Sequence, residues 1–216
     1  MPAATPKHEW RKREKEFYLP QPQPEVIAVP AFKFLTLAGE GNPNDEPFAE
    51  AITALYSLAY GIKMTAKKPD RRPAGYHDYT VYPLEGEWDL NEEGRKKYAG
   101  TINKNDLVFT LMIRQPDFVE TSFFEEIRQM VMKRKPQPLL GEVRFEEIAE
   151  GKCVQMLHVG PYDDEPASFR RMEGFAAGQG LERASMRHRE IYLSDFRKTA
   201  PEKLKTVLRF QVSPAS

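Results

Sequence analysis

The tripeptide Asp45-Glu46-Pro47 returns 119 residues later as Asp164-Glu165-Pro166, and the match extends in both directions without a gap. Over residues 33–63 the alignment contains six identities in 31 positions. Each copy follows the same plan: an alternating apolar run, a Gly/Pro turn, an acidic residue that can cap a helix, and a Pro in the first helical turn. The repeat predicts two homologous units, and the junction between such units is a natural place for a ligand.

The hydrophobic pattern predicts the same order of elements in both units. The first unit is expected to contain strands over 26–38, 79–84 and 107–114, with a helix after the first strand that ends at Gly61. The second is expected to contain a strand over 152–158, a helix over 164–178, and strands over 188–193 and 206–212. Two strand-helix-strand-strand units in tandem predict an α+β fold, in which a pseudo-symmetric antiparallel sheet carries helices on one face.

These expectations define the domain organisation. Residues 1–25 are polar and then rich in Pro, which is typical of an arm followed by a stiff connector. We expect one domain over 26–214, made of a first unit (about 26–116), a connecting helix (about 117–138) and a second unit (about 142–214). The arm is too short for a helix-turn-helix module.

Composition disfavours several classes of function. The 32 basic and 32 acidic residues cancel, whereas nucleic-acid binders usually carry a basic excess. No apolar stretch is long enough to span a membrane, and no stretch is typical of a signal peptide. The single cysteine, Cys153, cannot form an internal disulfide, so a cytoplasmic location is the default. The four histidines lack metal-ligand spacing, and we expect neither a metal nor a cofactor.

Glu190 is the strongest candidate for a catalytic residue. On a strand, Glu190 and Tyr192 point to the same face. A carboxylate among aromatic rings is poorly solvated, which raises its pKa and suits it to proton transfer. The alternative is an exposed glutamate on a solvated sheet face.

Further candidates surround this pair. Tyr162 follows the turn Gly160-Pro161 and is expected to donate a hydrogen bond to a ligand or water; it could equally pack on the following helix. Tyr82 and Trp88 flank a loop and can stack on a flat ligand or anchor that loop. Phe175 and Met112 complete the candidate ligand-binding set, although packing in the core is the simpler interpretation for both.

Two motifs carry a resemblance to a known family. The segments 158–162 (His-Val-Gly-Pro-Tyr) and 190–195 (Glu-Ile-Tyr-Leu-Ser-Asp) resemble the GyrI-like small-molecule-binding family, and the likeness covers roughly residues 17–214. Asn42-Pro43-Asn44-Asp45 and the segment 83–88 look like its stand-alone members. The resemblance implies tandem units with a ligand pocket between them. One stand-alone branch hydrolyses the cyclopropane ring of cyclopropanoid natural products within an aromatic cage; here Asp89 stands where that branch often has a further aromatic residue.

Three functions follow as hypotheses. The first is a protein that captures flat, hydrophobic or cationic xenobiotics and hydrolyses strained rings, with Glu190 activating water and Tyr162 stabilising oxyanion charge. The second is a non-catalytic binding or sequestering protein with the same pocket. The third is an inhibitor of a protein partner such as a topoisomerase. Neither nucleic acid nor membrane is an expected partner.

Overall fold

The computed structural model describes residues 7–215, so the first six residues of the expected arm and Ser216 lie outside the described residues. The helices are α1 (Trp10–Arg13), α2 (Lys15–Tyr18), α3 (Glu46–Ala66), α4 (Glu92–Lys97), α5 (Thr121–Arg134) and α6 (Glu165–Gly178). The strands are β1 (Glu25–Glu40), β2 (Leu84–Leu90), β3 (Leu107–Gln115), β4 (Arg144–Val159), β5 (Leu181–Arg183), β6 (His188–Tyr192) and β7 (Lys205–Pro214). Short 3-10 segments are η1 (Pro69–Arg71), η2 (Lys104–Asp106), η3 (Pro138–Gly141), η4 (Tyr162–Asp164) and η5 (Pro201–Lys203).

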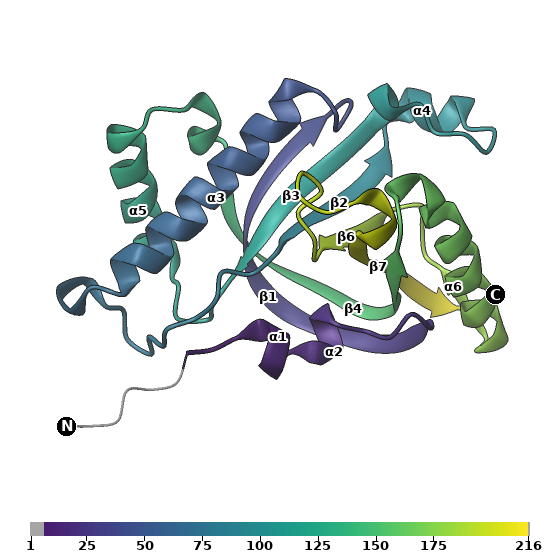
Figure 1. The fold of residues 1–216 in the computed structure, drawn as a ribbon, viewed down its shortest axis with the longest axis horizontal. Coiled ribbons are helices and arrows are strands. Elements are labelled where there is room, and N and C mark those ends of the chain that lie inside the picture. Colours follow the sequence, from purple (N-terminus) through teal and green to yellow (C-terminus); the bar gives the residue numbers. More distant parts are fainter. Residues whose placement is uncertain (1–6, 216) are drawn as a thin grey trace.

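Six antiparallel strands close into a barrel in the order β4-β1-β3-β2-β6-β7, because β7 also pairs with β4 (Figure 1). Strand β5 pairs with β7 outside this ring. Exchanging β1 with β4, β2 with β6, and β3 with β7 leaves the order of the ring unchanged. The expected α+β fold of tandem strand-helix-strand-strand units is therefore confirmed, and the sheet additionally closes on itself.

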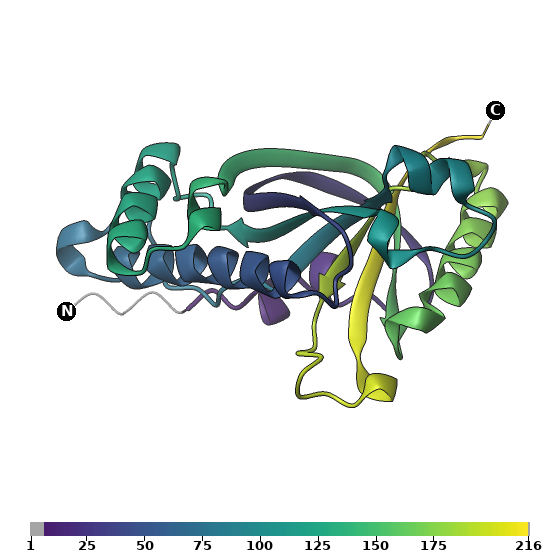
Figure 2. The same ribbon diagram turned by 90° about the horizontal axis from the view of Figure 1, so that it is seen from above.

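The two long helices that follow the first strand of each unit lie over different parts of the sheet (Figures 1 and 2). Helix α3 packs against β1 and β3, and α6 packs against β4 and β5. The expected end of the first helix at Gly61 is wrong, because α3 continues to Ala66. A Cβ at Gly61 would meet Val131 at 3.0 Å and Ile127 at 3.1 Å, so this glycine permits close packing of α5 on α3.

The second strand of the first unit is displaced from its expected position. It spans Leu84–Leu90 rather than residues 79–84, because Pro83 cannot donate a hydrogen bond to a neighbouring strand. Trp88 therefore lies within β2 and not in a loop. The segment before Pro83 pairs instead with the N-terminal arm, where Thr80 N–H donates to the carbonyl of His8 at 2.8 Å.

The N-terminal arm is part of the packed structure. Trp10 and Tyr18 are buried, and the indole N–H of Trp10 donates to the carbonyl of Val81 at 3.0 Å. Arg209, on β7, donates to the carbonyl of Phe17 at 2.6 Å. The arm thus packs against elements of both units.

Charged side chains fill part of the barrel. Arg189 pairs with Glu85 at 3.0 Å, and Arg209 pairs with Glu150 at 3.0 Å. The side chains of Arg189 and Glu85 are each 2% exposed. Removing one member of such a buried pair would leave an uncompensated charge, so these residues contribute to folding only together.

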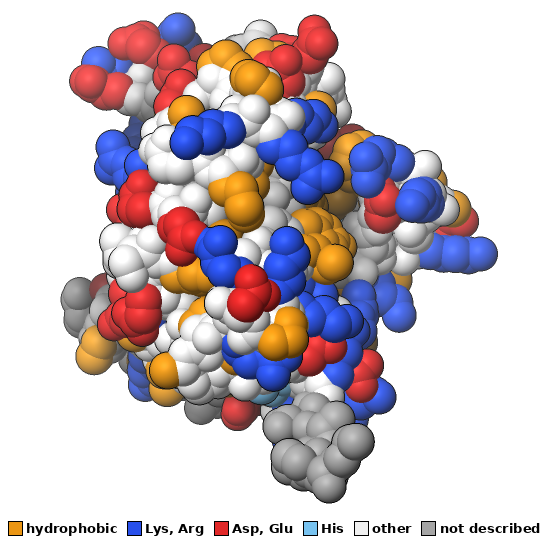
Figure 3. Space-filling model, turned by 90° about the vertical axis from the view of Figure 1, so that its left-hand side faces the viewer, with side chains coloured by type: hydrophobic (Ala, Val, Ile, Leu, Met, Phe, Trp, Pro, Cys, Tyr) orange, Lys and Arg blue, Asp and Glu red, His pale blue; other side chains and the backbone are white. Residues whose placement is uncertain are grey.

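The outer surface is mixed in character. On the side shown in Figure 3, basic, acidic and hydrophobic side chains are interspersed, in keeping with the balanced charge of the chain. Within residues 7–215, no helix is both long and apolar enough to cross a membrane.

Candidate functional site

Strand β6 presents His188, Glu190 and Tyr192 on one face, while the alternating Arg189 and Ile191 are buried on the other. The strand pairs with both β2 and β7, so its backbone is fixed on each side. The side chain of Glu190 is 12% exposed. Glu190 is therefore largely enclosed and does not lie on an open sheet face.

A directional chain of hydrogen bonds leads to Glu190. The indole N–H of Trp88 donates to the hydroxyl oxygen of Tyr192 at 2.8 Å. Because that oxygen accepts from Trp88, the Tyr192 proton is directed to Glu190 Oε2, at 2.8 Å. His188 Nε2 lies 3.2 Å from the other oxygen, Oε1. The structure thus brings together three residues expected at the site, Glu190, Tyr192 and Trp88.

A second carboxyl group, that of Glu165, lies beside Glu190. Glu165 is the first residue of α6 and is 6% exposed. Its pKa is raised well above the ordinary value, first by burial and then by the neighbouring charge of Glu190, to which its protonated form donates a hydrogen bond. Among the described residues, its Oε1 has no hydrogen-bond partner. Burial and the neighbouring Glu190 therefore favour the protonated form of Glu165.

Sequence reasoning used Glu165 only as part of the repeated tripeptide and missed it as a site residue. The available signal was its place in the first turn of a helix that follows the Gly-Pro-Tyr turn. The turn that orients Tyr162 also orients a residue at that position. The missing information was the approach of α6 to β6, which sequence spacing does not give.

Tyr162 is placed by a fixed turn. Gly160 has φ 139°, which favours glycine, and His158 Nε2 donates to the carbonyl of Pro161 at 3.1 Å. The Tyr162 ring contacts that of Tyr192 edge-on, with centroids 6.1 Å apart. Burial, followed by the charges of Glu190 and Glu165, raises the pKa of Tyr162 to about 12. Tyr162 is therefore a neutral phenol and a hydrogen-bond donor at neutral pH.

Aromatic residues of the first unit adjoin the Trp88 end of this chain. Phe48 on α3, Trp88 on β2 and Phe109 on β3 contact one another with ring centroids 5.1–5.7 Å apart. Sequence reasoning missed Phe48 and Phe109. A Cβ at Gly86 would meet Trp88 Nε1 at 2.7 Å, so the absence of a side chain there makes room for the indole. The first unit thus supplies aromatic surface and the second supplies the two carboxyl groups.

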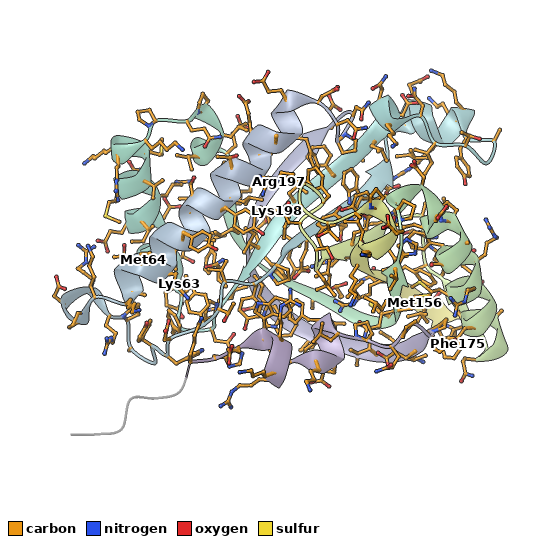
Figure 4. The ribbon with its side chains drawn as sticks, viewed as in Figure 1. Lys63, Met64, Met156, Phe175, Arg197 and Lys198 are labelled. Carbon is orange, nitrogen blue, oxygen red and sulfur yellow. The ribbon has the colours of Figure 1, made fainter. Side chains whose placement is uncertain are left out.

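Three residues expected at the site lie elsewhere. Tyr82 donates to Glu14 of the arm at 2.6 Å and lies with Tyr18. Met112 is buried on β3, on the face opposite to that of Leu111 and Phe109. Phe175, a residue of α6, packs against the hydrophobic cluster that contains Met156 (Figure 4). The structure does not bring these three side chains to Glu190.

Two cavities lie away from the carboxyl pair. One, of about 760 Å³, is bounded by β1, β3, α5 and the start of β4. The other, of about 140 Å³, lies beside α4. Neither is lined by Glu190 or Tyr192. Within residues 7–215, no three His, Cys, Asp or Glu side chains converge to hold a metal ion.

The Gly160-Pro161-Tyr162 turn, strand β6 and the tandem barrel agree with the family that the sequence comparison identifies. The model of the GyrI-like small molecule binding domain matches residues 22–213. The chain belongs to the GyrI-like family. Two solved structures described as hydrolases from Listeria innocua are similar to it, at 38% and 40% identity and TM-scores of 0.85 and 0.86. Each match covers 96% of this chain and 100% of the other.

A more distant similarity concerns the fold alone. The C-terminal domain of EcmrR matches with a TM-score of 0.52 at 13% identity, over 89% of this chain and 98% of that one. No functionally curated protein gives a significant sequence match. The comparisons therefore establish the family and its small-molecule-binding character.

Proposed function

We propose that this protein binds flat, hydrophobic small molecules and hydrolyses a strained three-membered ring in them, with cyclopropanoid compounds as the substrate class. The observation that carries the proposal is the buried Glu165 carboxyl, whose pKa is raised by burial and by the neighbouring Glu190, close to the rings of Tyr162 and Tyr192. A carboxyl group that keeps its proton beside a second carboxyl group is suited to donate that proton while its neighbour accepts one.

The proposed reaction adds one water molecule across the ring. Glu190 accepts a proton as the water oxygen bonds to a ring carbon and a carbon–carbon bond of the ring breaks. The electron pair of that bond passes to a carbonyl oxygen conjugated with the ring. Tyr162 donates a hydrogen bond to this oxygen, and Glu165 supplies its proton. The proton held by Glu190 then returns to Glu165 through their hydrogen bond.

The aromatic residues provide binding and orientation. Tyr162, Tyr192 and Phe48 are partly exposed, whereas Trp88 and Phe109 are buried. A flat ligand that stacks on the partly exposed rings would hold its electrophilic carbon near Glu190, and positioning of this kind accelerates reaction with water. Ring strain reduces the barrier that the protein must lower. The hydrolase description of the relatives at 38% and 40% identity supports this assignment.

Mass spectrometry of a cyclopropanoid compound incubated with the protein tests the proposal. The wild type should convert it to a product heavier by one water, and Glu190→Gln should retain binding while turnover falls by about 100-fold or more, as expected for loss of a general base. Glu46→Gln, a change of the same kind at an exposed carboxylate, is the matched control. Full turnover by Glu190→Gln would refute its role; binding without product in the wild type would leave a sequestering protein.

A further inference from the structure

His188 contacts the Glu190 carboxylate from its own strand. The two residues share one face of β6, and the side chain of His188 is 16% exposed. Its ring packs edge-on against Phe169 of α6, with centroids 4.7 Å apart. The imidazole is therefore held between α6 and β6 while it keeps some contact with solvent.

The two ring nitrogens face different partners. Nδ1 lies 3.1 Å from the carbonyl oxygen of Met186, and Nε2 lies 3.2 Å from Glu190 Oε1. A carboxylate oxygen can only accept a hydrogen bond, so the Glu190 contact places a proton on Nε2. The Met186 carbonyl also accepts from Arg183 Nη2 at 2.7 Å. The Glu190 contact is attractive only when a proton lies between Nε2 and Oε1.

Two other groups donate to Glu190. Glu165 donates from α6, and Tyr192 donates to Oε2 while its own oxygen accepts from Trp88. Several titratable or charged groups surround His188 and Glu190 on the packed elements: Glu165 on α6, Tyr162 on η4, Tyr192 on β6, Arg183 on β5 with its partner Glu173, and Arg187 with its partners Glu87 and Asp89. His188 Nε2 lies 3.2 Å from Oε1, the oxygen to which Tyr192 does not donate.

We infer that His188 is a positioning residue for Glu190: its Nε2–H donates to Oε1 and fixes the orientation of the carboxylate. The inference rests on the proposed function for its kinetic consequence, but the contact itself is a property of the protein without substrate. His188 needs no contact with the ligand to act in this way.

Substitutions that keep or remove the hydrogen-bond donor test the kinetic consequence. His188→Gln keeps an N–H donor at this position, whereas His188→Leu has no donor. His188→Gln should therefore retain most of the wild-type kcat. His188→Leu should lose about tenfold or more in kcat at every pH, with little change in KM, as expected when a reacting group is misoriented.

Nitrogen-15 NMR of the histidine rings in the wild-type protein tests the contact without any substrate. Nε2 of His188 should carry a proton. A ring without a proton on Nε2 would overturn the inference, as would a His188→Leu variant with unchanged kcat. If no cyclopropanoid compound is hydrolysed, the proposed function fails, and the NMR result alone decides the positioning of Glu190 by His188.

Discussion

Helices α3 and α6 begin with the same acidic tripeptide, yet the two glutamates have opposite environments. Glu46 is exposed, whereas Glu165 is buried beside Glu190. The paired strands β2 and β6 also differ between the units. Gly86 on β2 has no side chain, whereas its partner Glu190 on β6 carries a carboxyl group. The repeat thus supplies the frame of the barrel, while the proposed chemistry lies in positions where the two units have diverged.

Exchanging each of the two glutamates for glutamine tests whether Glu46 and Glu165 differ in function as they differ in burial. Glu165→Gln removes the proton that we propose is delivered to the substrate, and turnover should fall by about 100-fold, within the range for a lost general acid. Glu46→Gln should leave turnover unchanged, because its carboxylate is solvated. Rates measured by product formation in mass spectrometry compare the two; equal effects from both changes would contradict the assignment.

Tyr192→Phe tests the hydrogen-bond chain that enters the site from the first unit. The change removes the donor to Glu190 Oε2 and the acceptor for Trp88 while keeping the ring. We expect kcat to fall by about tenfold, equivalent to about 1.4 kcal/mol in the barrier, with ligand affinity nearly retained. An unchanged kcat would mean that Oε2 needs no donor during the reaction.

Phe48→Leu tests the aromatic contribution of the first unit. The side chain stays apolar, but the ring contacts with Trp88 and Phe109 are lost. In the proposed complex the Phe48 ring also stacks on the ligand, and an aromatic contact contributes about 1 kcal/mol, so ligand affinity should weaken by about fivefold. Phe175→Leu, a matched change in the other hydrophobic cluster, should leave affinity unaltered. Titration of ligand fluorescence would measure both, and a larger loss in Phe175→Leu would place the binding surface elsewhere.

The smallest expected effect concerns stability. The folded-state pKa of Glu165 is raised above its ordinary value of 4.5, chiefly by burial. The stability that its proton contributes is fully present below that value and is lost as pH rises through the raised folded-state pKa. Glu165→Gln should therefore gain stability relative to the wild type between pH 5 and pH 8 in urea unfolding. A constant difference in unfolding free energy over this range would argue against a raised pKa.

The sequence predicted most of the frame and part of the site. The repeat around Asp45 and Asp164 gave the tandem architecture, and alternation along β6 placed Glu190 and Tyr192 on one face. It could not reveal that the first turns of α6 lie against β6, because that contact joins residues far apart in the chain. For the same reason Phe48 and Phe109 were missed, and Tyr82 was assigned to the site although it pairs with Glu14 of the arm.

Two predictions were wrong where the two units differ locally. Gly61 was taken as a helix end, but its lack of a side chain serves the contact with α5. The strand expected over 79–84 was misplaced, because the hydrogen-bonded strand begins only after Pro83. In both cases a residue that often interrupts secondary structure was interpreted without knowledge of the element packed against it.

The central claim is that one carboxyl group of the Glu165–Glu190 pair is protonated at neutral pH. Infrared spectroscopy of the protein labelled with carbon-13 glutamate measures this directly, since protonated and ionised carboxyl groups absorb at different frequencies. We predict a protonated-carboxyl band at pH 7 that is present in the wild type and in Glu46→Gln and absent in Glu165→Gln. No such band in the wild type, or a band that persists in Glu165→Gln, would contradict the account.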